Sequence, residues 1–233
     1  MKISAIIPAM NAASTLGETL DSVAAQSFAP FEVIVVDDGS SDATAAIAAR
    51  HRIGARVISV PNRGAAAATN IGVNAAAGEW LAFLDSDDLW PPDRLESTIR
   101  VAEKSSKAAI IGGAKSFPDP AITPEELAGL RYVKETAIAL FPGALFLRKD
   151  VFLALGGYDE QFRTGYFIDF YDRFRHAGHE IETIPECVLL RRIRRNSLGG
   201  RSSEAAAQGQ DQLSRDFLRI AREAIRRKQK PKG

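Results

Sequence analysis

Short apolar runs alternate with segments whose apolar residues recur at helical spacing through the first half of the chain. The apolar runs predict strands at residues 3–8, 31–36, 55–60, 79–84 and 108–111. The segments between them predict helices at residues 14–27, 41–52, 64–77 and 91–104. Strands that alternate with helices are typical of βαβ units. The pattern therefore predicts an α/β fold with a Rossmann-like, mostly parallel central sheet and helices on both faces.

The pattern is less regular in the second half of the chain. Residues 114–136 contain several prolines and few apolar runs, so we expect an irregular excursion with a short helix at 124–130. Further helices are predicted at 149–155 and 167–176, and further strands at 180–184 and 187–190. We divide the chain into a main domain at 1–202, with halves at 1–112 and 113–202, a basic amphipathic helix at 203–228 and a disordered tail at 229–233.

Composition is ordinary for a soluble globular protein, with 45% hydrophobic and 25% charged residues in 233 positions. The net charge of +1 gives no reason to expect nucleic acid as a partner. The single cysteine, Cys187, excludes an internal disulfide, and no apolar run reaches the length of a membrane span. The apolar run at residues 2–9 is too short for a signal peptide and fits a strand. We therefore expect a cytoplasmic protein.

Basic residues gather in the last part of the chain, from Arg191 onward. A solvated helix face with a frayed end explains such a cluster. The same cluster could bring the protein to the inner face of a membrane, or form a homodimer contact. The sequence leaves these alternatives open.

Polar residues follow three of the predicted strands. They are Pro8 to Asn11, Asp37-Asp38, and Asp85-Ser86-Asp87-Asp88. Because ligands bind at the carboxyl ends of strands in open α/β sheets, we expect the three clusters to share one crevice. Two carboxylates spaced Asp-x-Asp can hold a hard divalent cation, and that cation can hold a diphosphate. The alternative is an acidic turn that caps the helix beginning near Pro91.

Five ordered segments together resemble a known family. They are Ile6 to Asn11, Val35 to Asp42, Arg63-Gly64 with Asn70 and Gly72, Gly78 to Asp88, and Gly156-Gly157-Tyr158-Asp159-Glu160. In this order and spacing, the segments resemble family 2 glycosyltransferases of the GT-A fold over roughly residues 3–190. The resemblance implies one GT-A domain, a nucleotide-sugar donor and inversion at the anomeric carbon. The C-terminal helix lies outside it.

The resemblance also implies roles for particular residues. Pro8, Ala9 and Asp38 would hold the base, Arg63 would line the nucleotide pocket, Asp85 would face the ribose or sugar, and Asn11 and Ser86 would complete the pocket. Asp87 would bind Mg²⁺ or Mn²⁺, which would act as a Lewis acid on the leaving diphosphate. Asp169, which follows the Gly-Gly-Tyr-Asp-Glu segment, would be the general base, with Asp172 as the runner-up.

The chain departs from the family pattern in the segment from Arg191 to Leu198, where relatives often have a histidine near position 194. Arg194 stands there instead. A guanidinium cannot bind a cation, but it can clamp a phosphate through two hydrogen bonds. We therefore expect Arg194 or a neighbour to neutralise the donor diphosphate and to weaken the metal dependence. Met10 also replaces an aromatic residue that often stacks on the base.

Other functions fit the sequence less well. A nucleotide-sugar-binding module without transfer activity would keep the same pocket, but the intact Asp87 and Asp169 favour an enzyme. A signalling receiver domain would be shorter, and a nucleotidyltransferase would need basic residues in the loop at 8–17. A UDP-sugar is the donor that the family suggests. The acceptor could carry its hydroxyl on a glycan, a lipid or a peptide.

Overall fold

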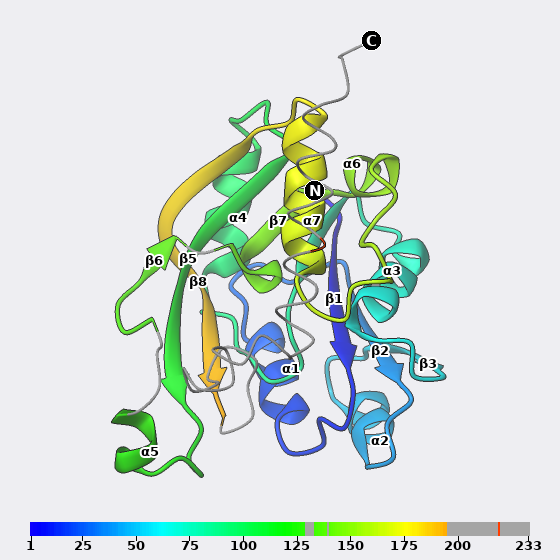
Figure 1. Ribbon diagram of the computed structural model, residues 1–233, viewed down its shortest axis with the longest axis vertical. Helices are drawn as coiled ribbons and strands as arrows, with labels where there is room; N and C mark the ends of the chain where they lie inside the picture. Colours follow the sequence, from blue (N-terminus) through cyan, green and yellow to red (C-terminus); the bar gives the residue numbers. More distant parts are fainter. Residues whose placement is uncertain (129–132, 139, 195–218, 220–233) are drawn as a thin grey trace.

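A mixed eight-stranded sheet forms the centre of the computed structural model, which describes residues 1–128, 133–138, 140–194 and 219 (Figure 1). Its strands are β1 (Ile3–Ala9), β2 (Glu32–Asp38), β3 (Arg56–Val60), β4 (Trp80–Phe83), β5 (Ala109–Pro118), β6 (Ala137–Ile138), β7 (Leu145–Arg148) and β8 (Ile181–Ile193). Its helices are α1 (Leu16–Ala24), α2 (Thr44–Arg50), α3 (Ala65–Ala75), α4 (Arg94–Ala102), α5 (Pro124–Ala128), α6 (Lys149–Ala154) and α7 (Tyr166–His176), with a 3₁₀ turn at η1 (Pro142–Ala144).

The strand order is β3-β2-β1-β4-β7-β5-β6, and β8 pairs with β5. The first four strands in this order are parallel to one another, as the alternation of strands and helices predicts. Strand β7 runs antiparallel between β4 and β5, while β5 and β8 are parallel. In Figure 1 the arrowheads of β1, β2, β5 and β8 point to the same edge of the sheet. The predicted fold class is confirmed.

The helices form two groups on the two faces of the sheet. On one face, α3 packs on β1 and β2, and the rings of Phe152, Tyr158 and Phe170 join α6 and α7 to Phe83 of β4. In Figure 1, α7 lies in front of the sheet on this side. On the other face, α1 contacts α2 and is tied to α4, because the Gln26 amide oxygen accepts from the backbone N–H of Leu95.

Strand β5 is longer than the predicted 108–111, and the predicted excursion at 114–136 is wrong for residues 114–118. The strand continues through Gly112 and Gly113, which sequence patterns associate with turns. Glycine is needed there because a Cβ at Gly112 would lie 2.5 Å from Val188 of β8. The strands predicted at 180–184 and 187–190 likewise form one strand, β8, whose register against β5 shifts at the two glycines.

None of the described helices is long and apolar enough to cross a membrane. The helix predicted at 203–228 and the tail at 229–233 lie outside the described residues, apart from Arg219. The guanidinium of Arg219 donates to the side chain of Gln161 and lies 4.7 Å from the ring centre of Phe162. The domain boundaries stay predictions.

Candidate functional site

The loops after β1 and β2 are joined by hydrogen bonds at the carboxyl edge of the sheet. Asn11 has a positive φ of 48°, which its short polar side chain tolerates. Its side-chain oxygen accepts from the backbone N–H of Ser41 at 2.9 Å, and its own N–H donates to Ser40 Oγ at 2.9 Å. These bonds fix the two loops to each other. Pro8 and Ala9 therefore stay beside Asp37 and Asp38 at the carboxyl edge of the sheet.

Asp38 fixes the start of α3 to the end of β2. Its two carboxylate oxygens accept from the backbone N–H groups of Arg63 and Gly64 at 2.7 and 2.8 Å. The residue is only 3% exposed. Backbone N–H groups at a helix start otherwise have no partner within the helix, so a carboxylate there is favourable. Asp38 thereby positions the loop that carries Arg63, whose side chain is 55% exposed.

Two threonines at the start of α1 and within it form hydrogen bonds to the loop after β4, residues Asp85 to Asp88, which we call the acidic loop. The hydroxyls of Thr15 and Thr19 donate to the backbone oxygen of Ser86 at 2.9 and 3.0 Å, and Thr19 also lies 3.0 Å from the backbone oxygen of Asp88. Strand β4 is adjacent to β1, which lies next to β2. The acids at the end of β2 and those after β4 therefore meet at one edge of the sheet, as predicted, with β1 between them.

Burial and mutual repulsion raise the pKa values of two carboxylates in the acidic loop. Burial raises the pKa of Asp85 to about 6, and the negative charge of Asp87 adds to the rise. Burial also raises the pKa of Asp88, with further increases from Asp85 and Asp87. The nearby positive charge of Arg191 opposes both shifts. A positively charged partner at this loop is therefore favourable.

Arginines at the end of β8 supply that charge. Strand β8 reaches the acidic loop through a bridge between Leu190 and Leu89. The backbone N–H of Arg192 donates to Asp88 Oδ1 at 2.8 Å, and Arg192 Nε donates to the backbone oxygen of Asp87 at 2.9 Å. The guanidinium of Arg194 donates to the carboxylate of Asp87.

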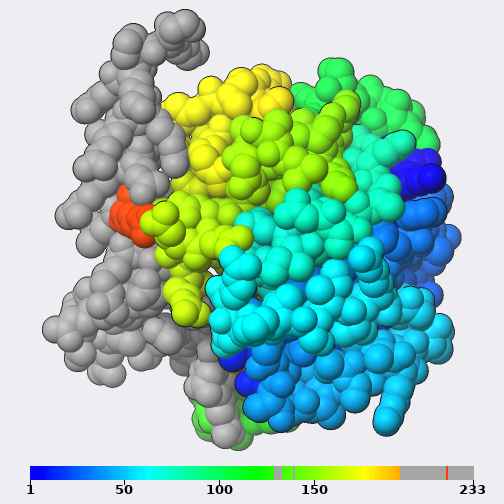
Figure 2. Space-filling model, turned by 90° about the vertical axis from the view of Figure 1, so that its right-hand side faces the viewer, coloured from blue at the N-terminus to red at the C-terminus, as the bar shows by residue number. Residues whose placement is uncertain are grey.

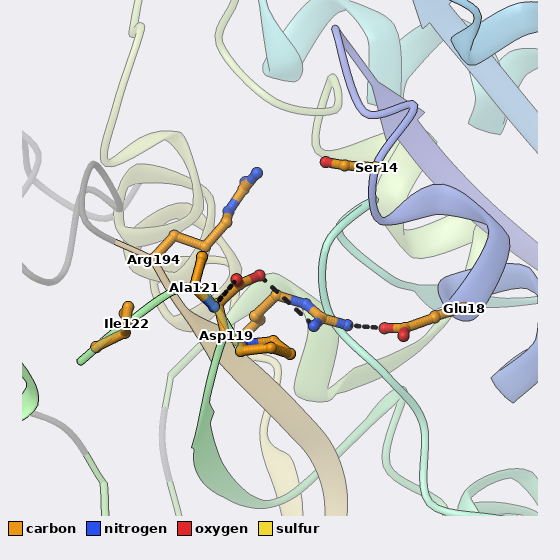
Figure 3. Close-up of a pocket in the computed structure, with 8 residues that line it drawn as sticks. Ser14, Glu18, Asp119, Ala121, Ile122 and Arg194 are labelled. Atoms are coloured by element: carbon orange, nitrogen blue, oxygen red, sulfur yellow. Dashed lines mark hydrogen bonds and ion pairs between the residues drawn. The ribbon is translucent and has the colours of Figure 1, made fainter. Parts of the chain in front are cut away.

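A cavity of about 660 Å³ opens beside these arginines (Figure 3). Its walls come from α1 and the residues before it, the segment after β5, and the end of β8 with the residue that follows, namely Ser14, Glu18, Asp119, Pro120, Ala121, Ile122, Arg192 and Arg194. Arg192 forms ion pairs with Glu18 and Asp119, which the dashed lines in Figure 3 mark. The side chain of Arg194 extends away from both acids in the same view.

The Gly-Gly-Tyr-Asp-Glu segment is fastened to α3. Asn70 Nδ2 donates to the backbone oxygen of Tyr158 at 2.8 Å, and Asn70 Oδ1 accepts from the N–H of Tyr158 at 2.9 Å. Arg63 and Glu160 add an ion pair at 2.8 Å. Figure 2 shows the cyan region of α3 lying against the yellow-green region that contains this segment. The loop before α7 is thus tied to the half of the molecule that carries Asp38.

The aromatic rings at the base of this segment approach the acidic loop. Burial raises the pKa of Tyr158 and of Tyr166, and the negative charge of Asp85 contributes to both shifts. Tyr166 begins α7, and Asp169 lies in its first turn. The structure therefore brings the start of α7 close to the acidic loop.

Asp169 itself is fully buried, with none of its side chain exposed. Its carboxylate accepts from Arg173 Nε at 2.8 Å, and Arg173 also donates to the backbone oxygen of Gly157 at 2.7 Å. Asp172, on the next turn, is 21% exposed and lies 3.3 Å from His176 Nδ1. Proton transfer to Asp169 would require its oxygen to become accessible to the acceptor.

The residues present do not fit a metal site with several protein ligands. Within the described ranges 1–128, 133–138, 140–194 and position 219, no three His, Cys, Asp or Glu side chains are arranged to hold a cation. Asp87, the predicted ligand, is already paired with Arg194. A cation at Asp87 would therefore have to compete with a guanidinium.

Comparison with known proteins identifies the family. The sequence model described as "Glycosyl transferase family 2" matches residues 4–138, more than half of the chain. The chain belongs to glycosyl transferase family 2. It is 28% identical over 172 residues to an uncharacterized glycosyltransferase of Haemophilus influenzae, covering 70% of this chain and 58% of the relative. It is 43% identical over 103 residues to the succinoglycan biosynthesis protein ExoO of Rhizobium meliloti, covering 43% of this chain and 30% of that protein.

A solved structure shows the same fold as this family 2 chain. The crystal structure of S. aureus TarS 1-349 in complex with UDP superimposes with a TM-score of 0.71 at 20% identity. The match covers 97% of this chain and 65% of the TarS chain. The family and fold predictions are confirmed, and the names of the relatives support the prediction of a glycosyltransferase enzyme. The chain spans less than two thirds of each of these three proteins.

The predicted site residues divide into two groups in this family 2 chain. Those at the ends of the first, second and fourth predicted strands gather at one edge: Pro8, Ala9, Asn11, Asp38, Asp85, Ser86 and Asp87. Arg63 and Arg194 reach that edge from the loop before α3 and from the position directly after β8. Asp169 is buried in the first turn of α7 and is paired with Arg173. Their roles stay predictions, which no ligand tests.

No sequence pattern indicated that four further polar residues hold these groups in place. Thr15, Thr19, Asn70 and Arg192 act through contacts with segments far along the chain. Each is an ordinary polar residue in or next to a helix or strand, so periodicity gives no signal for it. Only Asn70 fell within a segment that carried the family resemblance.

Proposed function

We propose that this chain transfers a sugar from a nucleotide-sugar donor to an acceptor hydroxyl. One observation carries the proposal: the family match coincides with a single sheet edge where β2 ends in two aspartates and polar or acidic residues follow β1 and β4. In open α/β sheets this edge is the ligand site. The base would bind at Pro8, Ala9 and Asp38, with Asn11 and Arg63 at the rim, and the sugar would face Asp85 and Ser86.

We expect the transfer to invert the anomeric carbon in a direct displacement. The acceptor oxygen would bond to the anomeric carbon while the bond to the diphosphate oxygen breaks. The hydroxyl proton would pass to a carboxylate of α7. Asp169 is our candidate because it lies in the first turn of α7, and the residue that begins this helix, Tyr166, is near enough to Asp85 for its charge to raise the pKa of Tyr166. Substrate binding must then open a path to its buried oxygen.

A UDP-sugar is the donor we propose, since TarS, which shares this fold, was solved with UDP. A divalent cation at the diphosphate would supply Lewis-acid catalysis when bound. The acceptor is proposed to be a glycan, lipid or peptide hydroxyl. ExoO, a relative by sequence, is named for succinoglycan biosynthesis, which favours a glycan for this chain. Membrane or dimer contacts through residues 203–228 stay predictions, because only Arg219 of that segment is described.

Nucleotide release tests the proposal. The protein is incubated with UDP-sugars and candidate acceptors, and UDP formation is measured for wild type, Asp169→Asn and Asp172→Asn. We expect Asp169→Asn to lower turnover by about 10²- to 10⁴-fold, the usual contribution of a general base, while donor binding is kept. Loss in Asp172→Asn alone would assign the base to Asp172. Donor binding without turnover in any protein would favour the alternative, a nucleotide-sugar-binding module.

A further inference from the structure

The arginines at the end of β8 differ in how exposed they are and in how many contacts hold them. The side chain of Arg192 is only 3% exposed and is held by Glu18, by the backbone oxygen of Asp87 and by the ring of Phe117 at 4.7 Å. Arg191 lies 4.0 Å from the ring centre of Phe141. Arg194, by contrast, is 42% exposed and lines the open cavity. Arg194 is therefore the one of these three that both lines the cavity and keeps a large exposed fraction.

The contact of Arg194 with Asp87 leaves most of its donors unused. Among the described residues, the guanidinium donates through Nη2 to Asp87, and no other hydrogen bond of Arg194 is found there. An arginine has five N–H donors in a planar fork that matches a phosphate. The remaining donors can therefore bind phosphate oxygens while Nη2 stays on Asp87.

A divalent cation at an Asp-x-Asp loop would join a carboxylate to the diphosphate. Arg194 has the same two properties that this role needs, since it is positively charged and already sits on Asp87. A cation would have to displace it, and the loop offers no three-ligand set in its described surroundings. The rest of the positive charge at the loop comes from Arg191 and Arg192, which remain in place.

We propose that Arg194 takes the place of the divalent cation, joining Asp87 to the diphosphate of the donor so that nucleotide binding needs no metal. The inference rests on the proposed function, because it assigns the diphosphate-binding group of that same site. If the inference is right, the nucleotide binds without a cation. Arg194 and a cation would then compete for the carboxylate of Asp87.

Nucleotide binding with and without metal tests the inference. The affinities for UDP, GDP, dTDP and CDP are measured by calorimetry in excess EDTA and in Mn²⁺, for wild type and Arg194→Met. We expect the affinity of wild type for its preferred nucleotide to be the same in EDTA and in Mn²⁺, within about threefold. Arg194→Met should bind it about 10- to 100-fold more weakly in EDTA, the usual loss for a charged hydrogen bond. Mn²⁺ should bring the nucleotide affinity of Arg194→Met closer to that of wild type, because Asp87 is unpaired in this variant and free to meet the cation.

The matched control is Arg148→Met, which removes an exposed arginine at the end of β7 from its ion pair with Asp150. It should bind like wild type. Wild-type binding that requires Mn²⁺, an Arg194→Met variant that binds normally in EDTA, or a deficit that Mn²⁺ leaves unchanged would each overturn the inference. Failure of all four nucleotides to bind in either condition would instead overturn the proposed function. Thermal unfolding of each variant checks that it folds.

Discussion

Replacing Asn70 with alanine tests whether the link between α3 and the Gly-Gly-Tyr-Asp-Glu segment holds the site together. The side chain makes two hydrogen bonds to the main chain of Tyr158, a residue that is 2% exposed, and a third to Glu160 at 3.2 Å. A neutral hydrogen bond contributes about 1 kcal/mol net, and a buried group left without a partner costs about 1–3 kcal/mol. The better helix propensity of alanine offsets about 0.5 kcal/mol.

We therefore expect Asn70→Ala to lower the free energy of unfolding by about 2 kcal/mol. Urea unfolding at 25 °C measures this as a midpoint shift of roughly 1 M, given slopes of about 1–3 kcal/mol/M. Turnover should fall more than donor binding does, because the loop leads into α7 and not into the base pocket.

Asn74 provides the matched control, since it is an exposed asparagine one turn further along the same helix. Asn74→Ala removes the same side chain without the link and should change stability by less than about 0.5 kcal/mol. If Asn70→Ala and Asn74→Ala were equally stable, the link would contribute nothing and our account of the loop would fail.

Two further predictions concern the acidic loop and the glycines of the linked segment. The raised pKa of Asp85 means that stability falls as pH rises from about 4 to about 6. In EDTA, Asp85→Asn should therefore gain about 1–3 kcal/mol over wild type above pH 6 and little near pH 4, whereas Asp21→Asn should lose stability, since Arg52 lowers the pKa of Asp21. A gain that does not vary with pH in denaturant titrations would contradict the assignment. Gly157→Ala should destabilise by at least about 1 kcal/mol more than Gly156→Ala: both have positive φ, but only at Gly157 would a Cβ meet Asn70 Oδ1 at 2.7 Å. Equal thermal unfolding of the two variants would refute this.

The strands and helices of the first half could be predicted because each depends on local periodicity. An apolar run such as 31–36 reads as a buried strand wherever it lies in the chain, and β2 covers Glu32–Asp38. Parallel pairing then sends the acids at the end of β2 and after β4 to one edge, so the place of the candidate site also follows from pattern. The second half was predicted less well, since the glycines that seemed to end β5 allow it to pass close to β8.

By itself, the sequence determined the fold class, the family, and the sheet edge to which the acidic residues come. Only the tertiary structure decided which charges meet there. Arg194 and Asp87 are 107 positions apart, and Arg192 and Asp88 are 104 apart. These contacts exist because β8 pairs with β5, with the antiparallel β7 inserted between β5 and β4. Such pairing depends on packing between distant segments, which no local pattern of apolar and polar residues encodes.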